Sequence, residues 1–254
     1  MKKELSNKTY TLNAIIVFAV IIIIWFIATE QGLVKEIILP KPINVVKYIY
    51  EGFTQNNLIA DVAISVQRIL LGFLASVILG VPLGILAGNS KICDSFIRPI
   101  CEFIRYIPVP TLVPLVMVWV GIGENAKIVV LFLGCVFQLL LMIADDASAI
   151  SSDLINAGYT LGATRLQSLT KILLPAMLQR IMETLRMVIG WAWTYLTLAE
   201  LFAANSGLGY RILKAQRFMQ TDAIFGLILT IGLLGLVTDR LFMLFNKKVF
   251  HWVE

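Results

Sequence analysis

The chain has 254 residues, of which 59% are hydrophobic and only 15% are charged, and its formal net charge is +5. Average soluble domains contain about 45–50% apolar and roughly 25% charged residues, so this composition indicates a membrane protein. A single histidine, with three cysteines that form no CxxC pair, argues against zinc sites and a disulfide framework, and we expect no metal ligands.

Runs without charged residues locate the membrane-spanning segments. A helix needs about 20 mainly apolar residues to cross the hydrocarbon core, with a usual range of about 17–25. The sequence predicts six spans, at residues 9–29, 69–90, 106–123, 128–144, 187–204 and 223–245. They predict an all-α polytopic membrane protein, with residues 1–254 forming a single transmembrane domain.

The first run follows three lysines, as the apolar core of a signal peptide would. It is longer than a usual signal core, however, and no small-x-small cleavage site follows it, so we expect an uncleaved helix. The loops on the N-terminal side hold 13 of the 21 lysines and arginines, which predicts that both termini are cytoplasmic. The positive charge therefore indicates membrane topology, and no nucleic-acid partner is expected.

Two polar intervals are longer than simple connections between spans require. The outer interval, residues 30–68, carries Ile43, Val46 and Ile49 at helical spacing, which predicts a short amphipathic helix on the membrane surface. The inner interval, residues 145–186, is predicted to be a cytoplasmic loop with a function of its own.

Glycines and prolines mark two of the spans. Gly80, Gly84 and Gly88 form a small-xxx-small face, which favours close packing against another helix over a direct role with substrate. Pro108, Pro110 and Pro114 begin the third span. They indicate either a distorted helix beside a pathway or a turn at the membrane interface.

The fourth and fifth spans contain the candidate pathway residues Gln138, Trp193, Tyr195, Thr197 and Glu200. A charged residue within a span is costly, so Glu200 is a functional candidate. The alternative is an interfacial carboxylate, hydrated or paired with Arg211. For Gln138, a residue of this kind more often forms a hydrogen bond between helices.

Nothing in the sequence predicts catalysis by this chain alone. His251 lies beyond the last span, so an intramembrane serine would have no base. No HExxH motif and no GxxxxGK[ST] phosphate-binding loop occur. We predict no catalytic residues, and the energy for active transport must come from a partner or an ion gradient.

The inner interval contains NAGYTLG at residues 156–162 and ILLP at residues 172–175. This pattern resembles the cytoplasmic signature of binding-protein-dependent ABC importer permeases, which reads EAA, three residues, G, nine residues, I-x-L-P. The spacing matches throughout, while Asn156 replaces the usual Glu and Gly158 the second Ala. Blocks at residues 39–42, 65–88, 98–128 and 199–241 are similar to the nitrate, sulfonate, taurine and bicarbonate group of these permeases.

The resemblance implies the type I ABC importer transmembrane fold in a bacterial inner membrane. The expected partners are membrane lipid, a second copy of the chain, two ATP-binding subunits that hold ATP and magnesium, and an extracytoplasmic solute-binding protein. This chain itself is expected to hold no cofactor. The residues expected to couple it to the ATPase are Asn156, Ala157, Gly158, Leu161, Gly162, Ile172, Leu174 and Pro175.

The expected substrate is a small oxyanion such as nitrate, bicarbonate, a sulfonate or taurine, and the alternative is an uncharged or heterocyclic nutrient such as a thiamine precursor. A secondary transporter or a channel working without an ATPase is the alternative class. A secondary transporter predicts two related halves with interrupted helices, and the sequence holds no convincing internal repeat.

Overall fold

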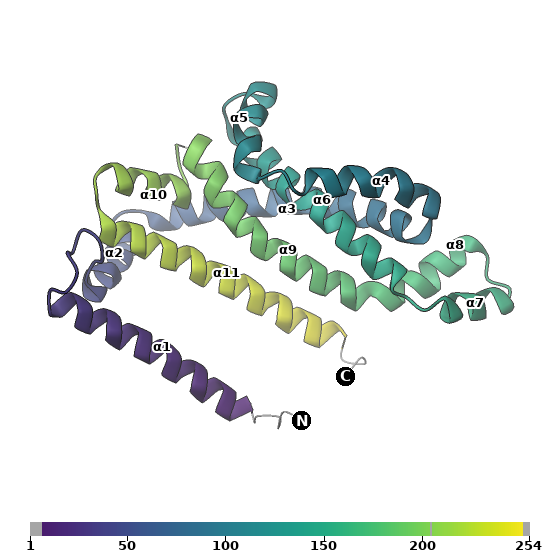
Figure 1. The fold of residues 1–254 in the computed structure, drawn as a ribbon, viewed down its shortest axis with the longest axis horizontal. Coiled ribbons are helices and arrows are strands. Elements are labelled where there is room, and N and C mark those ends of the chain that lie inside the picture. The colour runs from purple at the N-terminus through teal and green to yellow at the C-terminus, as the bar shows by residue number, and fades with distance from the viewer. Residues whose placement is uncertain (1–6, 204, 251–254) are drawn as a thin grey trace. The chain divides into compact units, whose positions relative to one another are not determined.

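The structure, a computed structural model, describes residues 7–203 and 205–250, and its regular elements are all helices (Figure 1). Helices suit a membrane because hydrocarbon offers no hydrogen-bond partner and a helix satisfies its backbone groups internally. The all-α fold class predicted from the sequence is thereby confirmed. His251 lies outside the described residues. The helices in chain order are α1 (Asn7–Glu30), α2 (Pro42–Thr54), α3 (Leu58–Asn89), α4 (Lys91–Ile104), α5 (Val109–Val120), α6 (Glu124–Ser148), α7 (Ser152–Thr160), α8 (Arg165–Gln167), the π-helix η1 (Ser168–Leu173), α9 (Leu174–Ala203), α10 (Leu208–Arg217) and α11 (Thr221–Val249).

Four of the described helices, α1, α3, α6 and α11, are long and apolar enough to cross a membrane. The pair α4 and α5 meets the same test but is bent by 102° at its junction. Helix α9 is not among them, and charged residues such as Arg186 and Glu200 lower its hydropathy. The boundaries of the six spans, the single-domain organisation and the side of the termini therefore stay predictions.

The bend between α4 and α5 coincides with the proline cluster. Pro108 is the N-cap of α5 and Pro110 lies in its first turn, where the missing N–H would have no partner inside the helix. Helix α5 has 12 residues, so it is about 18 Å long, shorter than the roughly 30 Å hydrocarbon core. The segment predicted as residues 106–123 thus begins with a turn and continues as a short helix.

The described residues form two compact units. The first lies within Met1–Ile59 and Arg211–Thr230. There α1 contacts α2, the indole N–H of Trp25 donates to the Pro40 carbonyl at 2.9 Å, and the Trp25 ring lies 5.9 Å from the Phe225 ring. The apolar side chains of α1 are mostly exposed, as expected for a helix that lipid surrounds.

The second unit lies within Ala60–Tyr210 and Ile231–Glu254, and α6 is at its centre. Helix α6 packs most extensively against α9, and also against α5 and α4. Its buried side chains are almost all apolar, including Leu131, Leu139 and Ile143. Burial of such side chains is worth about 1.5–3 kcal/mol each relative to exposure in water, although lipid reduces this term within a membrane.

Helix α3 lies against α6 through its glycine ladder. A Cβ atom at Gly80 would lie 3.2 Å from Leu139, and one at Gly84 would lie 2.7 Å from both the Cβ of Ile143 and the Leu140 carbonyl. Gly88 faces Ala144 and Ala147 in the same way. The structure thus places these three glycines at a close contact between two helices of the same chain.

We expect Gly84→Ala to destabilise the protein by about 1–3 kcal/mol, because the added methyl group has no room between α3 and α6. The measurement is the apparent melting temperature of the purified chain in detergent. Gly232→Ala is the matched control, since a Cβ at Gly232 of α11 meets nothing within 4 Å. Equal melting temperatures for the two variants would contradict the close α3–α6 contact.

Candidate functional site

The residues of the predicted ATPase signature lie in one continuous stretch, Ser151–Pro175, which we call the coupling segment. Ser151 caps the N-terminus of α7, and its hydroxyl accepts the Asp153 N–H at 3.2 Å. Helix α7 ends at Leu161, and Gly162 follows with φ +85°, a left-handed conformation that costs other residues about 1–2 kcal/mol. Gly162 therefore turns the chain back toward α8.

The second half of the coupling segment joins α9 without a break. Thr164 and Gln167 form a capping box at the start of α8, and the π-helix Ser168–Leu173 leads directly into α9 at Leu174. Pro175 explains the wide π turn, because its ring would clash with the Lys171 carbonyl in a regular α-helix. Because the helical path is continuous, a displacement of this half is passed to α9.

The two halves are held together by Gly158 and Ile172. The Cδ1 atom of Ile172 lies so close to Gly158 that a methyl group at residue 158 would clash with it. Gly158, which departs from the usual Ala, therefore admits a tighter approach of Ile172 to α7. Asn156 and Ala157 are exposed, so the other departure lies on the surface.

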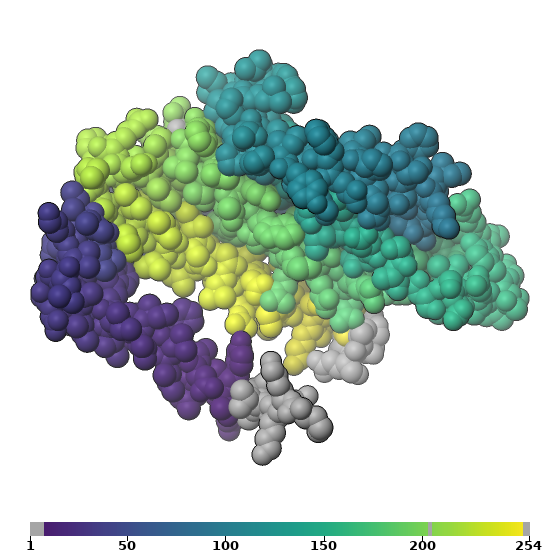
Figure 2. Space-filling view, in the orientation of Figure 1, coloured from purple at the N-terminus to yellow at the C-terminus, as the bar shows by residue number. Residues whose placement is uncertain are grey.

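The coupling segment exposes several large apolar side chains among polar ones. Leu161 is 88% exposed, and Tyr159 and Leu166 are also exposed. Figure 2 shows the surface of α7 and α8 protruding beyond α9. Beside it lies a hollow of about 470 Å³, lined by residues of α3, α7, α8 and η1 that include Leu86, Tyr159, Arg165 and Leu169. Exposed apolar groups of this kind are typical of a protein–protein contact.

A second group of interacting residues, the ionic cluster, surrounds Arg68 near the start of α3. Arg68 is 2% exposed and Glu200, from the end of α9, is fully buried. The guanidinium lies 2.6 Å from Glu200 and, through two parallel hydrogen bonds of 2.7 Å, contacts Glu124 at the start of α6. Lys127 adds a second cation, 2.6 Å from Glu124.

All five N–H donors of Arg68 are used. Besides the two carboxylates, they reach the backbone carbonyl of Ser206 at 2.8 Å and its hydroxyl at 3.0 Å. Glu200 in turn accepts from the Ser65 hydroxyl at 2.8 Å and from the Gly209 N–H at 2.7 Å. The cluster thus ties α3, α6 and α9 to the turn before α10.

The structure shows that Glu200 is not an interfacial carboxylate paired with Arg211. Its carboxylate is buried and paired with Arg68, whereas the guanidinium of Arg211 donates to the Asn56 carbonyl. The count of charges by loop does not reveal the role of Arg68. The available signal was spacing, because Asp61, Ser65 and Arg68 recur at helical intervals on one face and all three contact the cluster or its turn.

The remaining pathway candidates lie along α9 and α6. Trp193 is buried, and the ring of Tyr195 packs over Gly134 of α6. The Thr197 hydroxyl donates to the Trp193 carbonyl at 3.1 Å, within its own helix. Gln138 is half-buried on α6. Of the five candidates, only Glu200 belongs to the ionic cluster.

Residues 80–251 match the family model described as binding-protein-dependent transport system inner membrane component. The chain belongs to this family. Its members are permease subunits located in the inner membrane, and they work with ATP-binding subunits and a solute-binding protein. The resemblance drawn from residues 156–175 and the flanking blocks is thereby confirmed.

Similar proteins indicate which group within the family this chain resembles. The putative aliphatic sulfonates transport permease protein SsuC of Bacillus subtilis is 32% identical and covers 99% of this chain and 92% of its own length. The taurine transport system permease protein TauC of Escherichia coli is 30% identical over 92% of this chain and 87% of its own. The chain is therefore similar over nearly its whole length to permeases of the sulfonate and taurine group.

The fold agrees with that of solved transporters. A permease chain from the inward-facing MetNI methionine ABC transporter superposes with a TM-score of 0.69 at 21% identity, covering 76% of this chain and 95% of that one. The predicted type I importer fold is confirmed by this likeness, and at such identity the likeness concerns the fold alone.

Glu200→Gln should lower the apparent melting temperature by about 6–20 °C, because breaking a buried ion pair costs about 3–5 kcal/mol and each kcal/mol corresponds to about 2–4 °C in a chain of this size. Glu51→Gln is the matched control. It removes an exposed pair with Lys47, 3.7 Å apart, and should change the melting temperature by no more than about 2 °C. Equal shifts for the two variants would refute the structural role of the cluster.

Proposed function

We propose that this chain is the permease subunit of an ATP-driven importer for a small sulfonate-type oxyanion, and that the coupling segment binds a separate ATPase. Two copies of the chain would form the translocation path between them, with both termini in the cytoplasm. ATP and magnesium would be held by the partner subunits, since this sequence has no phosphate-binding loop.

The coupling segment carries the proposal. It exposes the apolar side chains of Leu161, Tyr159 and Leu166, it turns at the left-handed Gly162, and it joins α9 without a break. Asn156, Ala157 and Gly158 lie on α7, while Ile172, Leu174 and Pro175 form the junction to α9. A short helix so attached can transmit a displacement as rigid-body motion.

In the proposed cycle, two bound ATP molecules draw the coupling segments of both copies together, and the path opens outward to receive substrate. Hydrolysis lets the segments separate, and substrate leaves inward. The five donors of Arg68 are all engaged and Lys127 is paired, so neither buried base is available to an oxyanion. We therefore place substrate selectivity mainly in the solute-binding protein.

Gly162→Ala tests the coupling. A Cβ at this position meets nothing within 4 Å, so the substitution acts through the backbone conformation alone. A penalty of about 1–2 kcal/mol should reduce binding-protein-stimulated ATPase activity of the reconstituted complex by about 5- to 30-fold. Gly232→Ala, which adds a methyl group at an open position with ordinary φ, should leave it unchanged. Unchanged stimulation in Gly162→Ala would refute the assignment.

Uptake into proteoliposomes tests both the class of transporter and the substrate class. With binding protein, permease and ATPase all present, radiolabelled taurine or an alkanesulfonate should accumulate only when ATP is enclosed. Uptake that persists without the ATPase would favour a secondary transporter or channel. If a thiamine precursor, but no oxyanion, stabilises the binding protein in a thermal-shift assay, the proposed substrate class is wrong.

A further inference from the structure

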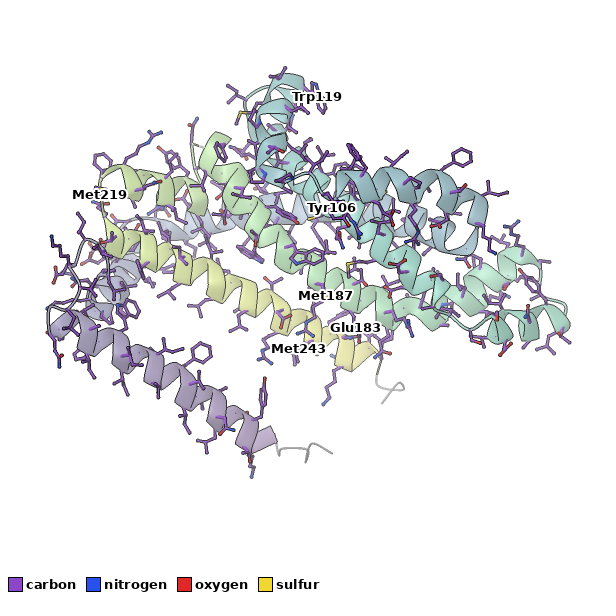
Figure 3. All side chains as sticks on the ribbon, in the orientation of Figure 1. Tyr106, Trp119, Glu183, Met187, Met219 and Met243 are labelled. Atoms are coloured by element: carbon purple, nitrogen blue, oxygen red, sulfur yellow. The ribbon has the colours of Figure 1, made fainter. Side chains whose placement is uncertain are left out.

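A pocket rich in basic side chains lies between α9 and α11 in the second unit. It has a volume of about 410 Å³ and is lined by Arg186 of α9 and by Arg240, Met243, Leu244 and Lys247 of α11. Figure 3 shows Met243 on α11 beside Glu183 and Met187 of α9. We call this hollow the basic pocket, and neither the ionic cluster nor the coupling segment contributes a residue to it.

Carboxylates neutralise only part of the charge of the basic pocket. The guanidinium of Arg186 pairs with Asp239, with one hydrogen bond of 2.9 Å, and exposed Glu183 also attracts it. Asp239 also attracts Arg240, whose guanidinium contacts the Met243 sulfur at 3.9 Å, and among the described residues neither Arg240 nor Lys247 lies within 4 Å of a carboxylate oxygen. The pocket thus offers two cations to an anion from outside.

The apolar part of the pocket continues along α11. Met243 and Leu244 line the pocket, and they are followed toward the middle of the helix by exposed Leu241 and Val237. Helix α11 is a candidate span, so this apolar surface is suited to lipid chains. A small free anion would use the bases but not this surface, so charge and apolar surface together indicate an amphiphilic anion.

We propose that the basic pocket binds the phosphate headgroup of an anionic phospholipid, whose acyl chains lie along the exposed apolar surface of α11. Basic pockets between membrane helices on the cytoplasmic side are a known form of headgroup recognition. Arg240 and Lys247 contact the phosphate, and Met243 and Leu244 contact the upper part of the chains. The bound lipid bridges α9 and α11, the first of which begins at the coupling segment.

The test is lipid binding by the full-length chain in detergent, measured by native mass spectrometry during titration with phosphatidylglycerol. Each base near an anionic headgroup contributes about a fivefold increase in affinity, so Arg240→Gln with Lys247→Gln should weaken phosphatidylglycerol binding by about 25-fold. Phosphatidylcholine should bind no better to the wild type than to the double variant. The readout does not involve transport, so a failure of the lipid proposal can be distinguished from a failure of the proposed function.

Arg105→Gln with Lys91→Gln is the matched control, since it removes one exposed arginine and one exposed lysine outside the pocket. This control should retain wild-type affinity for phosphatidylglycerol. Equal losses in both double variants would show a general charge effect and overturn the site. If inorganic phosphate competes as well as phosphatidylglycerol does, the pocket binds a free anion and the lipid assignment is wrong. Melting temperatures of both variants show whether either has failed to fold.

Discussion

A buried guanidinium must have each of its donors satisfied, and this requirement organises one end of the second unit. Arg68 makes five hydrogen bonds, to Glu124, Glu200 and Ser206. An unpaired charge removed from water would cost several kcal/mol, so α6 and α9 must each place a carboxylate within reach of α3. Close approach of α3 and α6 near the cluster is helped by Gly72, because a Cβ there would lie only 2.5 Å from Leu131 of α6.

Helix α9 connects this cluster to the coupling segment. Its 30 residues extend about 45 Å, from Leu174 beside the π-helix to the turn after Glu200. Glu200 holds one end to α3, and Gly158 lies close to Ile172 beside the other end. A displacement of the coupling segment therefore acts on a helix that is fixed at its far end by charge pairs rather than by apolar packing alone.

The ionic cluster, the basic pocket and the coupling segment differ in how their charges are paired. The ionic cluster satisfies its own charges internally and leaves no donor of Arg68 for a substrate anion. The basic pocket, nearer the opposite end of α9, contains Arg240 and Lys247, and Asp239 attracts Arg240 as well as Arg186. The coupling segment exposes several large apolar side chains, among them Leu161 and Leu166, in keeping with a partner that binds by surface burial.

Several features followed from the sequence alone, and each depends on local properties. Apolar runs predicted the helical class because only helices satisfy the backbone of such runs in lipid. The spacing of residues 156–175 predicted the family, because the signature is a pattern within one short stretch of the chain.

Only the tertiary structure decided which charges meet. Arg68 and Glu200 are separated by 132 residues, and nothing local in either segment specifies the other as partner. The structure also decided that Glu200 is a buried ion-pair partner and not an interfacial carboxylate. Pairing across that separation follows from how α3, α6 and α9 pack. Packing depends on the surfaces of all three helices together, and no single segment of the sequence specifies it.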